Sequence, residues 1–337
     1  MAETLVLNEG LTLESGAKLV PLEIAYARYG DPSHPVVFIC HALTGDAEAA
    51  SWWGTLIGPG KPVDTDRFHV VCANLLGGCR GTTGPSSPNP ETEAPYGLDF
   101  PLFTIRDLAE THRALLRELG ISKLHAAVGG SLGGMQILQW ALDHPDEIER
   151  AVLVCATARL TAQNIAFSKV ARHAILTHDA MDVARMMAHI TYVSVESLRR
   201  KFDRARRTPE AGMTLRSDFE VEFYLDHQSE IFLKRFDPHT YLYLSRVMDY
   251  FDPFAEAYER TPSTRFQLIS FDTDWRFGTE HSVFIEEQLR SREIAVARHE
   301  VASPWGHDSF LMDVPEYHEL VRRFLVYQEV AGALSKE

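Results

Sequence analysis

Residues 126–140 read AAVGGSLGGMQILQW and place a serine among glycines. The apolar run at 123–129 is typical of a buried strand, and residues 133–143 carry a helical pattern. Between these segments, residues 129–133 fit Gly-x-Ser-x-Gly. A sharp strand-to-helix turn needs small residues beside the serine, and it presents the serine oxygen to the free amides of the helix N-terminus. Ser131 is therefore predicted to be a nucleophile; the alternative is a glycine-rich turn with an incidental serine.

Strand and helix patterns alternate on both sides of this turn. Apolar or β-rich runs predict strands at residues 36–42, 68–76, 123–129, 150–157, 265–272 and 296–302. Helical patterns lie at residues 104–120, 133–143, 281–292 and 316–330. Two β-rich segments within residues 4–29 indicate an antiparallel ribbon at the start of the chain. The alternation predicts an α/β fold with a mostly parallel sheet and helices on both faces.

The pattern changes after about residue 158. Residues 160 to about 260 hold few β-rich runs and many helix formers, and the strand-helix alternation then returns. We therefore predict a core domain made of residues 1–158 and 262–337, with a helical insertion at 159–261. An insertion between two strands of such a sheet is expected to lie above the sheet as a lid.

A serine is a weak nucleophile unless a histidine takes its proton and an acid orients that histidine. In the α/β-hydrolase fold these residues follow the chain order Ser, Asp, His. Asp274 follows the predicted strand 265–272, and His307 follows the predicted strand 296–302. Both positions lie past the carboxyl ends of strands, where such sites are built. Asp272 is the rival acid.

An oxyanion hole needs two backbone donors, so its residues are chosen by position and not by side chain. One donor is expected to be the amide of Leu132, directly after the nucleophile. The other is expected from the loop HALTG, residues 41–45, after the first buried strand, and we assign it to Leu43. The alternative for this loop is a simple turn.

A second glycine-rich stretch is NLLGGCRGTTGPSSP at residues 74–88. It lacks the lysine of a phosphate-binding loop and the Gly-x-Gly-x-x-Gly spacing of a dinucleotide site. The cysteines show no C-x-x-C pair, which argues against a zinc or redox site. Cys40, Cys72 and Cys155 are predicted to be buried strand residues, and Cys79 is the one whose reactivity merits a test.

The composition excludes several classes of partner. The 337-residue chain is 45% hydrophobic and 24% charged, with a formal net charge of −14. Nucleic acids and anionic membranes both require basic surfaces, so neither is an expected partner. The sequence has no apolar run long enough to cross a bilayer, and MAETLVLNEG lacks the features of a signal peptide. A cytoplasmic protein is the expectation.

Five motifs, HALTGD, NLLGGCRGTTGPSS, GGSLGGMQ, DTDW and GHDSFL, occur together in one order. In this combination the chain resembles the homoserine O-acetyltransferases of methionine biosynthesis and their serine-acylating and succinyl-transferring relatives. The resemblance runs from about residue 20 to 327. It implies that the stretch at 74–88 is an active-site loop and not a nucleotide cradle.

The resemblance implies an α/β-hydrolase fold and a ping-pong reaction. Ser131 would attack acetyl-CoA or another acyl-CoA, the co-substrate, and the hydroxyl of L-homoserine would then take the acyl group. Asp274 and His307 would complete the triad, and Asp308 would hold the substrate's amino group. The resemblance implies no metal and no cofactor. It implies a homodimer joined through the helical lid.

One departure from the family concerns the amino-acid acceptor. Where members usually carry Tyr-Arg-Ser in the lid, with the arginine on the substrate carboxylate, this chain has Tyr192, Val193 and Ser194. Either another cation substitutes or the acceptor differs from homoserine. Arg80 in the glycine-rich loop, and Arg199 or Arg200 in the lid, are candidates by residue type, against the simpler reading of solvated surface charge.

A second departure is the segment RFGT after Asp274, which is expected to alter loop shape more than chemistry. Three alternatives stay open at this stage. They are a succinyl donor instead of an acetyl donor, serine or another hydroxyl compound as the acceptor, and attack of water on the acyl-serine. The last case would make the protein an esterase, thioesterase or lactonase. A non-catalytic binding protein is disfavoured because all three triad positions are filled.

Overall fold

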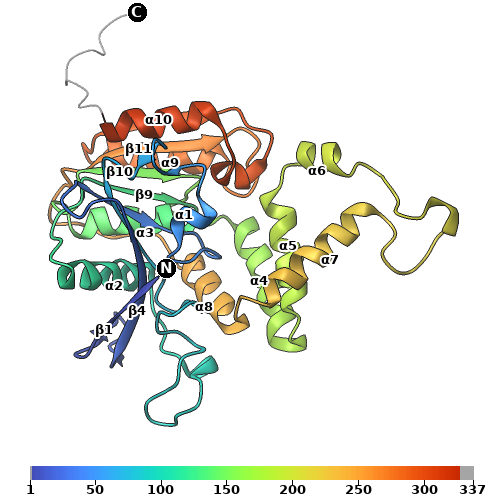
Figure 1. Ribbon diagram of the computed structural model, residues 1–337, viewed down its shortest axis with the longest axis horizontal. Coiled ribbons are helices and arrows are strands. Elements are labelled where there is room, and N and C mark those ends of the chain that lie inside the picture. The colour runs from blue at the N-terminus through green and yellow to red at the C-terminus, as the bar shows by residue number, and fades with distance from the viewer. Residues whose placement is uncertain (1, 327–337) are drawn as a thin grey trace, which may run out of the picture.

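A computed structural model describes residues 2–326 of the chain. An eight-stranded sheet forms its centre, in the order β1-β4-β8-β5-β9-β10-β11-β12 (Figure 1). Its strands are β1 (Glu3–Leu7), β4 (Leu22–Tyr29), β5 (Val36–Cys40), β8 (His69–Ala73), β9 (Ala126–Gly130), β10 (Arg150–Val154), β11 (Arg265–Phe271) and β12 (Val296–Val301). The six strands from β8 to β12 in this order run parallel, whereas β1 and β4 are antiparallel. The predicted mostly parallel sheet is confirmed.

Most of the predicted strands extend beyond the observed ones at their carboxyl ends. The run at 36–42 ends as a strand at Cys40, and the run at 150–157 ends at Val154. The residues that follow leave the sheet and form loops along one edge. After β8 and β10 the loops begin with buried apolar residues, among them Leu75, Leu76 and Ala156, so the hydrophobic pattern continues past the strand ends and the sequence could not mark where these strands stop.

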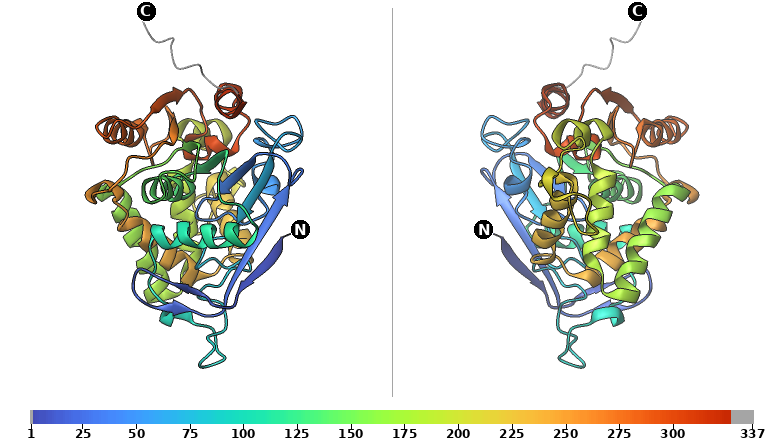
Figure 2. Two further views of the ribbon diagram at one scale, coloured as in Figure 1. Left: turned by 90° about the vertical axis from the view of Figure 1, so that its left-hand side faces the viewer. Right: turned by 90° about the vertical axis from the view of Figure 1, so that its right-hand side faces the viewer.

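Helices cover both faces of the sheet, as the two side views in Figure 2 show. Apolar residues of α2, α3 and α9 pack with one set of alternating strand residues, and those of α1 and α10 pack with the other set. The helices of the core are α1 (Ala49–Trp52), α2 (Ile105–Glu118), α3 (Leu132–Asp143), α9 (Thr279–Arg290) and α10 (Pro315–Val326). Strand residues alternate between the two faces, so each face presents its own apolar layer to its helices.

Local capping signals set the start of α2. The side chain of Thr104 accepts from the backbone amide of Asp107, and the Asp107 side chain accepts from the Thr104 amide, which is the predicted capping box. Helix α10 matches the predicted helix at 316–330 as far as Val326, and the remaining predicted residues lie outside the described part of the chain.

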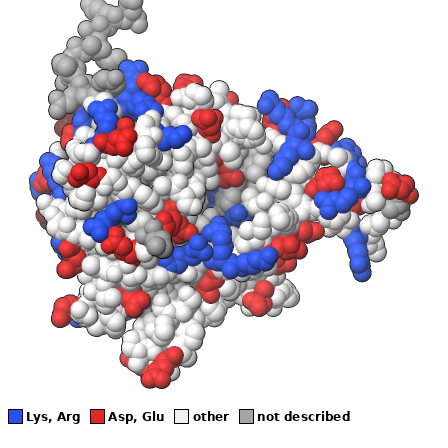
Figure 3. Space-filling model, in the orientation of Figure 1, with Lys and Arg blue, Asp and Glu red and all other residues white. Residues whose placement is uncertain are grey.

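Five helices occupy the segment between β10 and β11: α4 (Ala162–His178), α5 (Met181–Tyr192), α6 (Val195–Lys201), α7 (Glu220–Leu233) and α8 (Pro238–Asp249). Figure 1 shows α5, α6 and α7 to the right of the core, and α8 below the sheet. On the face drawn in Figure 3, basic side chains gather along the junction between core and lid. The helical content of 159–261 agrees with the expected insertion, whereas the domain limits themselves stay a prediction.

The remaining short strands form two small sheets outside the main one. They are β2 (Leu11–Thr12) with β3 (Lys18–Leu19), and β6 (Ile57–Gly58) with β7 (Val63–Asp64). With β1 and β4, the first of these makes up the antiparallel ribbon that residues 4–29 predict. Within residues 2–326, the structure holds no helix long and apolar enough to cross a bilayer.

Candidate active site

Ser131 lies in the turn between β9 and α3. Its backbone has φ 55° and ψ −123°, a conformation that costs a non-glycine residue energy and recurs at functional turns. Gly133 and Gly134 must be glycines because a larger side chain would not fit at either position. A Cβ on Gly133 would lie 2.0 Å from the carbonyl oxygen of Cys40, and a Cβ on Gly134 would lie 2.5 Å from Cβ of Ala156. The glycines therefore let the turn press into the sheet while the serine side chain points outward.

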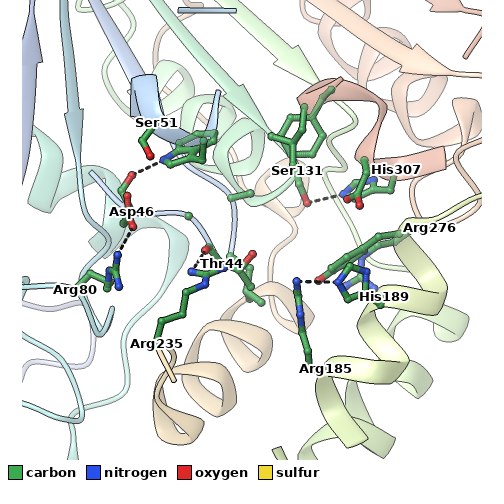
Figure 4. Close-up of a pocket in the computed structure, with 18 of the residues that line it drawn as sticks. Thr44, Asp46, Ser51, Arg80, Ser131, Arg185, His189, Arg235, Arg276 and His307 are labelled. Atoms are coloured by element: carbon green, nitrogen blue, oxygen red, sulfur yellow. Dashed lines mark hydrogen bonds and ion pairs between the residues drawn. The ribbon is translucent and has the colours of Figure 1, made fainter. Parts of the chain in front are cut away.

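The structure brings the predicted base and acid to this serine. Nε2 of His307 lies 3.0 Å from Oγ of Ser131 (Figure 4). Nδ1 of the same ring lies 2.7 Å from Oδ2 of Asp274. The Asp274 side chain is fully buried, and its Oδ1 accepts from the amides of Arg276 and Phe277, each at 2.9 Å. These two amides hold the carboxylate in place and aim its other oxygen at the imidazole. The chain order and the geometry are those of a serine-histidine-aspartate triad.

Asp272, the rival acid, has a different partner. It is exposed, and its Oδ1 accepts from the amide of Ser303 at 2.9 Å. The neighbouring Thr273 accepts from the amide of Gly306 at 3.0 Å. Both residues therefore fasten the loop that carries His307, while Asp274 contacts the histidine itself.

Aromatic side chains enclose the imidazole of His307. The ring centroids of Tyr192, Phe277 and Phe310 lie 5.8, 5.2 and 5.9 Å from its own. The lid also reaches this loop, since a Cβ on Gly306 would lie 2.6 Å from the amide nitrogen of Ser194. The histidine is thus held in a largely apolar setting, where its hydrogen bonds to the serine and the acid gain strength.

The two expected oxyanion donors have suitable backbone positions. Leu132 is the first residue of α3, and the amides of a helix's first turn have no partner inside the helix. Leu43 is the second residue of a turn closed by the amide of Gly45, which donates to the carbonyl of Ala42 at 3.0 Å. The turn lines the same cavity as Ser131. Their role as donors stays a prediction.

A cavity of about 320 Å³ opens beside Ser131 between the core and the lid. Four arginines line it, and three of them were not identified from the sequence. These three are Arg185 on α5, Arg235 after α7 and Arg276 after β11. Arg276 could have been identified from its position in the sequence, two residues after the predicted acid. A loop that directly follows Asp274 must lie at the site. The interpretation that the RFGT segment affects mainly loop shape missed this cation.

The contacts of these arginines differ. Nη1 of Arg276 donates to Thr191 Oγ1 at 2.9 Å, and its guanidinium lies 5.1 Å from the ring centroid of Tyr192. Arg185 lies 3.0 Å from Nε2 of His189, and burial together with this arginine lowers the pKa of His189 to about 4. A neutral His189 carries no negative charge, so this neighbour leaves the positive charge of Arg185 uncompensated.

The predicted cations Arg199 and Arg200 do not line the cavity. Both are more than half exposed, and both pair with Glu196 at i+3 and i+4 on α6. Of the sequence candidates only Arg80 lines the cavity, where it pairs with Asp46 at 3.1 Å and remains 45% exposed. Its assignment to substrate binding stays a prediction. The backbone carbonyl of Val193 accepts from Trp275 Nε1 at 3.2 Å, so this position joins the lid to the core.

Asp308 lines the cavity next to His307. Burial raises the pKa of its carboxyl to about 6, although the charges of His307 and Arg185 oppose this shift. A carboxylate held in this way can bind an ammonium group, which would relieve the cost of its burial.

The cysteines fall close to their predicted positions. Cys40 and Cys72 are buried strand residues, and Cys79 is half-buried with a pKa raised by burial. Cys155 is also buried, but it follows β10 instead of lying in it, and it has φ 48°. Its sulfur lies within 4.8 Å of ligand atoms of Asp274 and His307.

The comparisons with known proteins agree with this architecture. A family model described as the alpha/beta hydrolase fold matches residues 35–314, so the chain has the α/β-hydrolase fold that was predicted. A structure of homoserine O-acetyltransferase from Bacillus anthracis superposes with a TM-score of 0.89 at 23% identity, covering 97% of this chain and 98% of that one. A crystal structure of esterase E22 superposes with a TM-score of 0.86 at 25% identity, covering 96% of this chain and 100% of that one.

Sequence relatives narrow the class further. The chain is 52% identical over 350 residues to a homoserine O-succinyltransferase of Nocardioides sp., covering 94% of this chain and 95% of that protein. It is 42% identical to a homoserine O-acetyltransferase of Rhodopseudomonas palustris, covering 97% of this chain and 91% of that protein. The chain belongs to the homoserine O-acyltransferase family, and it is an acyltransferase, as predicted.

Proposed function

We propose that the protein transfers a succinyl group from succinyl-CoA to the hydroxyl of L-homoserine. The observation that carries this proposal is a cavity at Ser131 that holds two cations from different elements, Arg185 and Arg276, together with the carboxylate Asp308. An amino-acid acceptor has one ammonium and one carboxylate, and a succinyl group brings a second carboxylate. The cavity offers a side chain of opposite charge for the ammonium and for each of the two carboxylates.

The first half-reaction acylates the serine. Oγ of Ser131 attacks the thioester carbonyl while His307 Nε2 takes the hydroxyl proton, and Asp274 stabilises the imidazolium. The amides of Leu43 and Leu132 would stabilise the oxyanion. The C–S bond then breaks, the thiolate of CoA takes the proton from the imidazolium, and the acyl group remains on Ser131.

The second half-reaction transfers the acyl group to the acceptor. His307 takes the proton of the homoserine hydroxyl, whose oxygen attacks the acyl-serine carbonyl. The C–O bond to Ser131 breaks, and the serine oxygen recovers the proton from the imidazolium. O-acylhomoserine leaves, and the enzyme returns to its starting state.

The charges in the cavity support an assignment for each substrate group. Asp308 would hold the ammonium of homoserine, and Arg185 on the lid would hold its carboxylate. Arg185 then supplies the cation that is missing at position 193, from a site on α5 about two turns before the end of that helix. Arg276, which follows the acid on the core side, would hold the distal carboxylate of a succinyl group. An acetyl group has no charge for it.

The relatives favour the same donor without deciding it. The relative at 52% identity is named a succinyltransferase, whereas acetyltransferases occur at 42% identity. The sequence-based expectation gave acetyl as the first choice with succinyl as the alternative. The position of Arg276 in the cavity is the reason to reverse that order.

Release of the CoA thiol tests the proposal. The enzyme is given succinyl-CoA or acetyl-CoA, with L-homoserine, L-serine or no acceptor, and the thiol is followed with a colorimetric reagent. Release that requires homoserine and is faster with succinyl-CoA is expected. A preference for acetyl-CoA would refute the donor, a preference for serine would refute the acceptor, and equal release without acceptor would mean hydrolysis.

We further propose that the lid joins two copies of the chain. Apolar lid side chains support this, since Leu176, Ile190 and Val195 are 58%, 45% and 80% exposed. Light scattering of the purified protein is expected to give twice the chain mass of 38.0 kDa. A Val195→Asp variant is expected to shift that mass toward the monomer, and a monomeric parent protein would refute this proposal.

A further inference from the structure

The loop that presents Leu43 is fixed from below by the core. Nε2 of Gln136 on α3 donates to the carbonyl of His41 at 3.2 Å. Nδ1 of His41 lies 2.7 Å from the carbonyl of Ala42, and that carbonyl also accepts from Gly45. Two hydrogen bonds to the Ala42 oxygen polarise the peptide whose N–H belongs to Leu43, which makes this amide a stronger donor.

The same loop is fixed from above by the lid. Nη1 of Arg235 donates to the carbonyl of Thr44 at 3.0 Å, across 191 residues of sequence. Figure 4 shows this contact between the segment after α7 and the loop. The Arg235 guanidinium also lies 5.3 Å from the ring centroid of Phe232, and its backbone carbonyl accepts from Cys79 Sγ at 3.7 Å. Arg235 thus joins the lid to both active-site loops of the core.

We infer that Arg235 is a positioning residue for the oxyanion hole. Thr44 follows Leu43 in the turn, so a bond that holds the Thr44 carbonyl also restricts the direction of the Leu43 amide. The lid would therefore complete the catalytic site as well as cover it. This inference rests on the proposed acylation of Ser131 and on Leu43 as a donor, but it is independent of which acyl donor and acceptor are used.

The competing role for Arg235 is direct binding of a substrate anion. Burial and the neighbouring charges of Arg185 and Arg80 lower its pKa, so holding this cation at the cavity is unfavourable without a partner. The Thr44 carbonyl is such a partner, whereas a substrate carboxylate or phosphate would be another. An uncharged substrate separates the two roles, because it has no anion for an arginine to bind.

The test uses p-nitrophenyl acetate, which is uncharged and releases p-nitrophenolate when Ser131 attacks it. Variants Arg235→Met and Arg235→Lys are compared with the parent protein. The matched control is Arg246→Met on α8, where an exposed arginine pairs with Asp249 at 3.2 Å outside the cavity. Removing an oxyanion donor costs about 10²–10³ in rate, and misaligning one costs less.

The expected result for Arg235→Met is a fall of roughly 10- to 100-fold in the maximal acylation rate, with an apparent KM within about 3-fold of the parent value. Arg235→Lys should recover part of this rate because an ammonium can still donate to one carbonyl. Arg246→Met should stay within about 2-fold, as surface changes usually do. Unchanged acylation by p-nitrophenyl acetate in Arg235→Met, with a raised KM for the acyl-CoA, would overturn the inference in favour of substrate binding.

A second measurement tests the inference if Arg235→Met folds poorly. An uncharged aryl trifluoromethyl ketone forms a tetrahedral adduct with the serine and places its oxyanion in the hole. Arg235→Lys, which keeps the positive charge, should weaken its inhibition constant by the same factor as it slows acylation. An unchanged inhibition constant would overturn the inference, whereas a parent protein that releases no p-nitrophenolate would refute the nucleophile and with it the proposed function.

Discussion

Replacement of Arg276 by leucine separates the donor assignment from the rest of the mechanism. The guanidinium lines the cavity, and within residues 2–326 its side-chain hydrogen bond goes to Thr191. Its backbone amide supports Asp274 through Oδ1, and this bond survives any change of side chain. Loss of the side chain should therefore affect a substrate carboxylate without removing the support of the triad.

The size of the effect follows from the interaction that is lost. A hydrogen bond to a charged group contributes about 1.5–3 kcal/mol. Because about 1.4 kcal/mol corresponds to a factor of ten, kcat/KM for succinyl-CoA should fall roughly 10- to 150-fold in Arg276→Leu. The value for acetyl-CoA should change by less than about 3-fold, since its methyl group makes no charged bond. Arg276→Lys should lie between the two, because a lysine keeps the charge but lacks the planar fork.

Thiol release at varied donor concentration and saturating homoserine measures both constants. Arg290→Leu is the matched control, since this exposed arginine pairs with Glu286 on α9. An equal loss with both donors would show that Arg276 acts by packing against Tyr192 and Phe277, which its guanidinium contacts at 5.1 and 5.5 Å. No loss with succinyl-CoA would refute the reasoning outright, because the second carboxylate would then bind elsewhere.

Three further predictions concern the acid, the acceptor site and the nucleophile turn. Asp274→Asn should lower kcat by about 10³- to 10⁴-fold because the histidine loses its orienting charge. Asp272→Asn should lower kcat by less than about 10-fold, because the side chain of Asp272 bonds to the loop that carries the histidine. If steady-state assays gave the reverse order, the two roles would be exchanged. Burial raises the pKa of Asp308 to about 6, so its charge is present above that pH and is lost below it. The KM for homoserine should therefore rise as the pH falls through about 6, and a KM that stays flat between pH 5 and pH 7, measured as acceptor-dependent thiol release, would contradict a role in ammonium binding. Gly133→Ala should destabilise the fold by about 1–3 kcal/mol or more, because its Cβ would lie 2.0 Å from the backbone carbonyl of Cys40; an unchanged melting temperature in thermal denaturation would contradict this.

The residues of the predicted triad could be located from the sequence because each of them follows a strand. Ser131 stands in a motif whose glycines are required by the turn itself, and Asp274 and His307 each follow a later strand. In a parallel sheet the carboxyl ends of all strands lie along one edge, so residues far apart in the chain must approach one another there. The sequence also indicated that the sheet is mostly parallel, because buried strands that alternate with amphipathic helices leave few other arrangements, whereas the order of the strands came from the structure.

Which arginines line the cavity was decided by the tertiary structure. Arg199 and Arg200 looked as suitable as Arg185 by type, but they pair with Glu196 on α6 and stay outside the cavity. Arg235 acquires its partner, the Thr44 carbonyl, only when the lid packs on the core. An arginine side chain is long and its partner is rarely close in sequence, so its role depends on the direction its helix faces. A nucleophile turn is fixed by local sterics and is legible in a few residues, whereas a charge becomes a binding group only when folding encloses it without a neutralising neighbour.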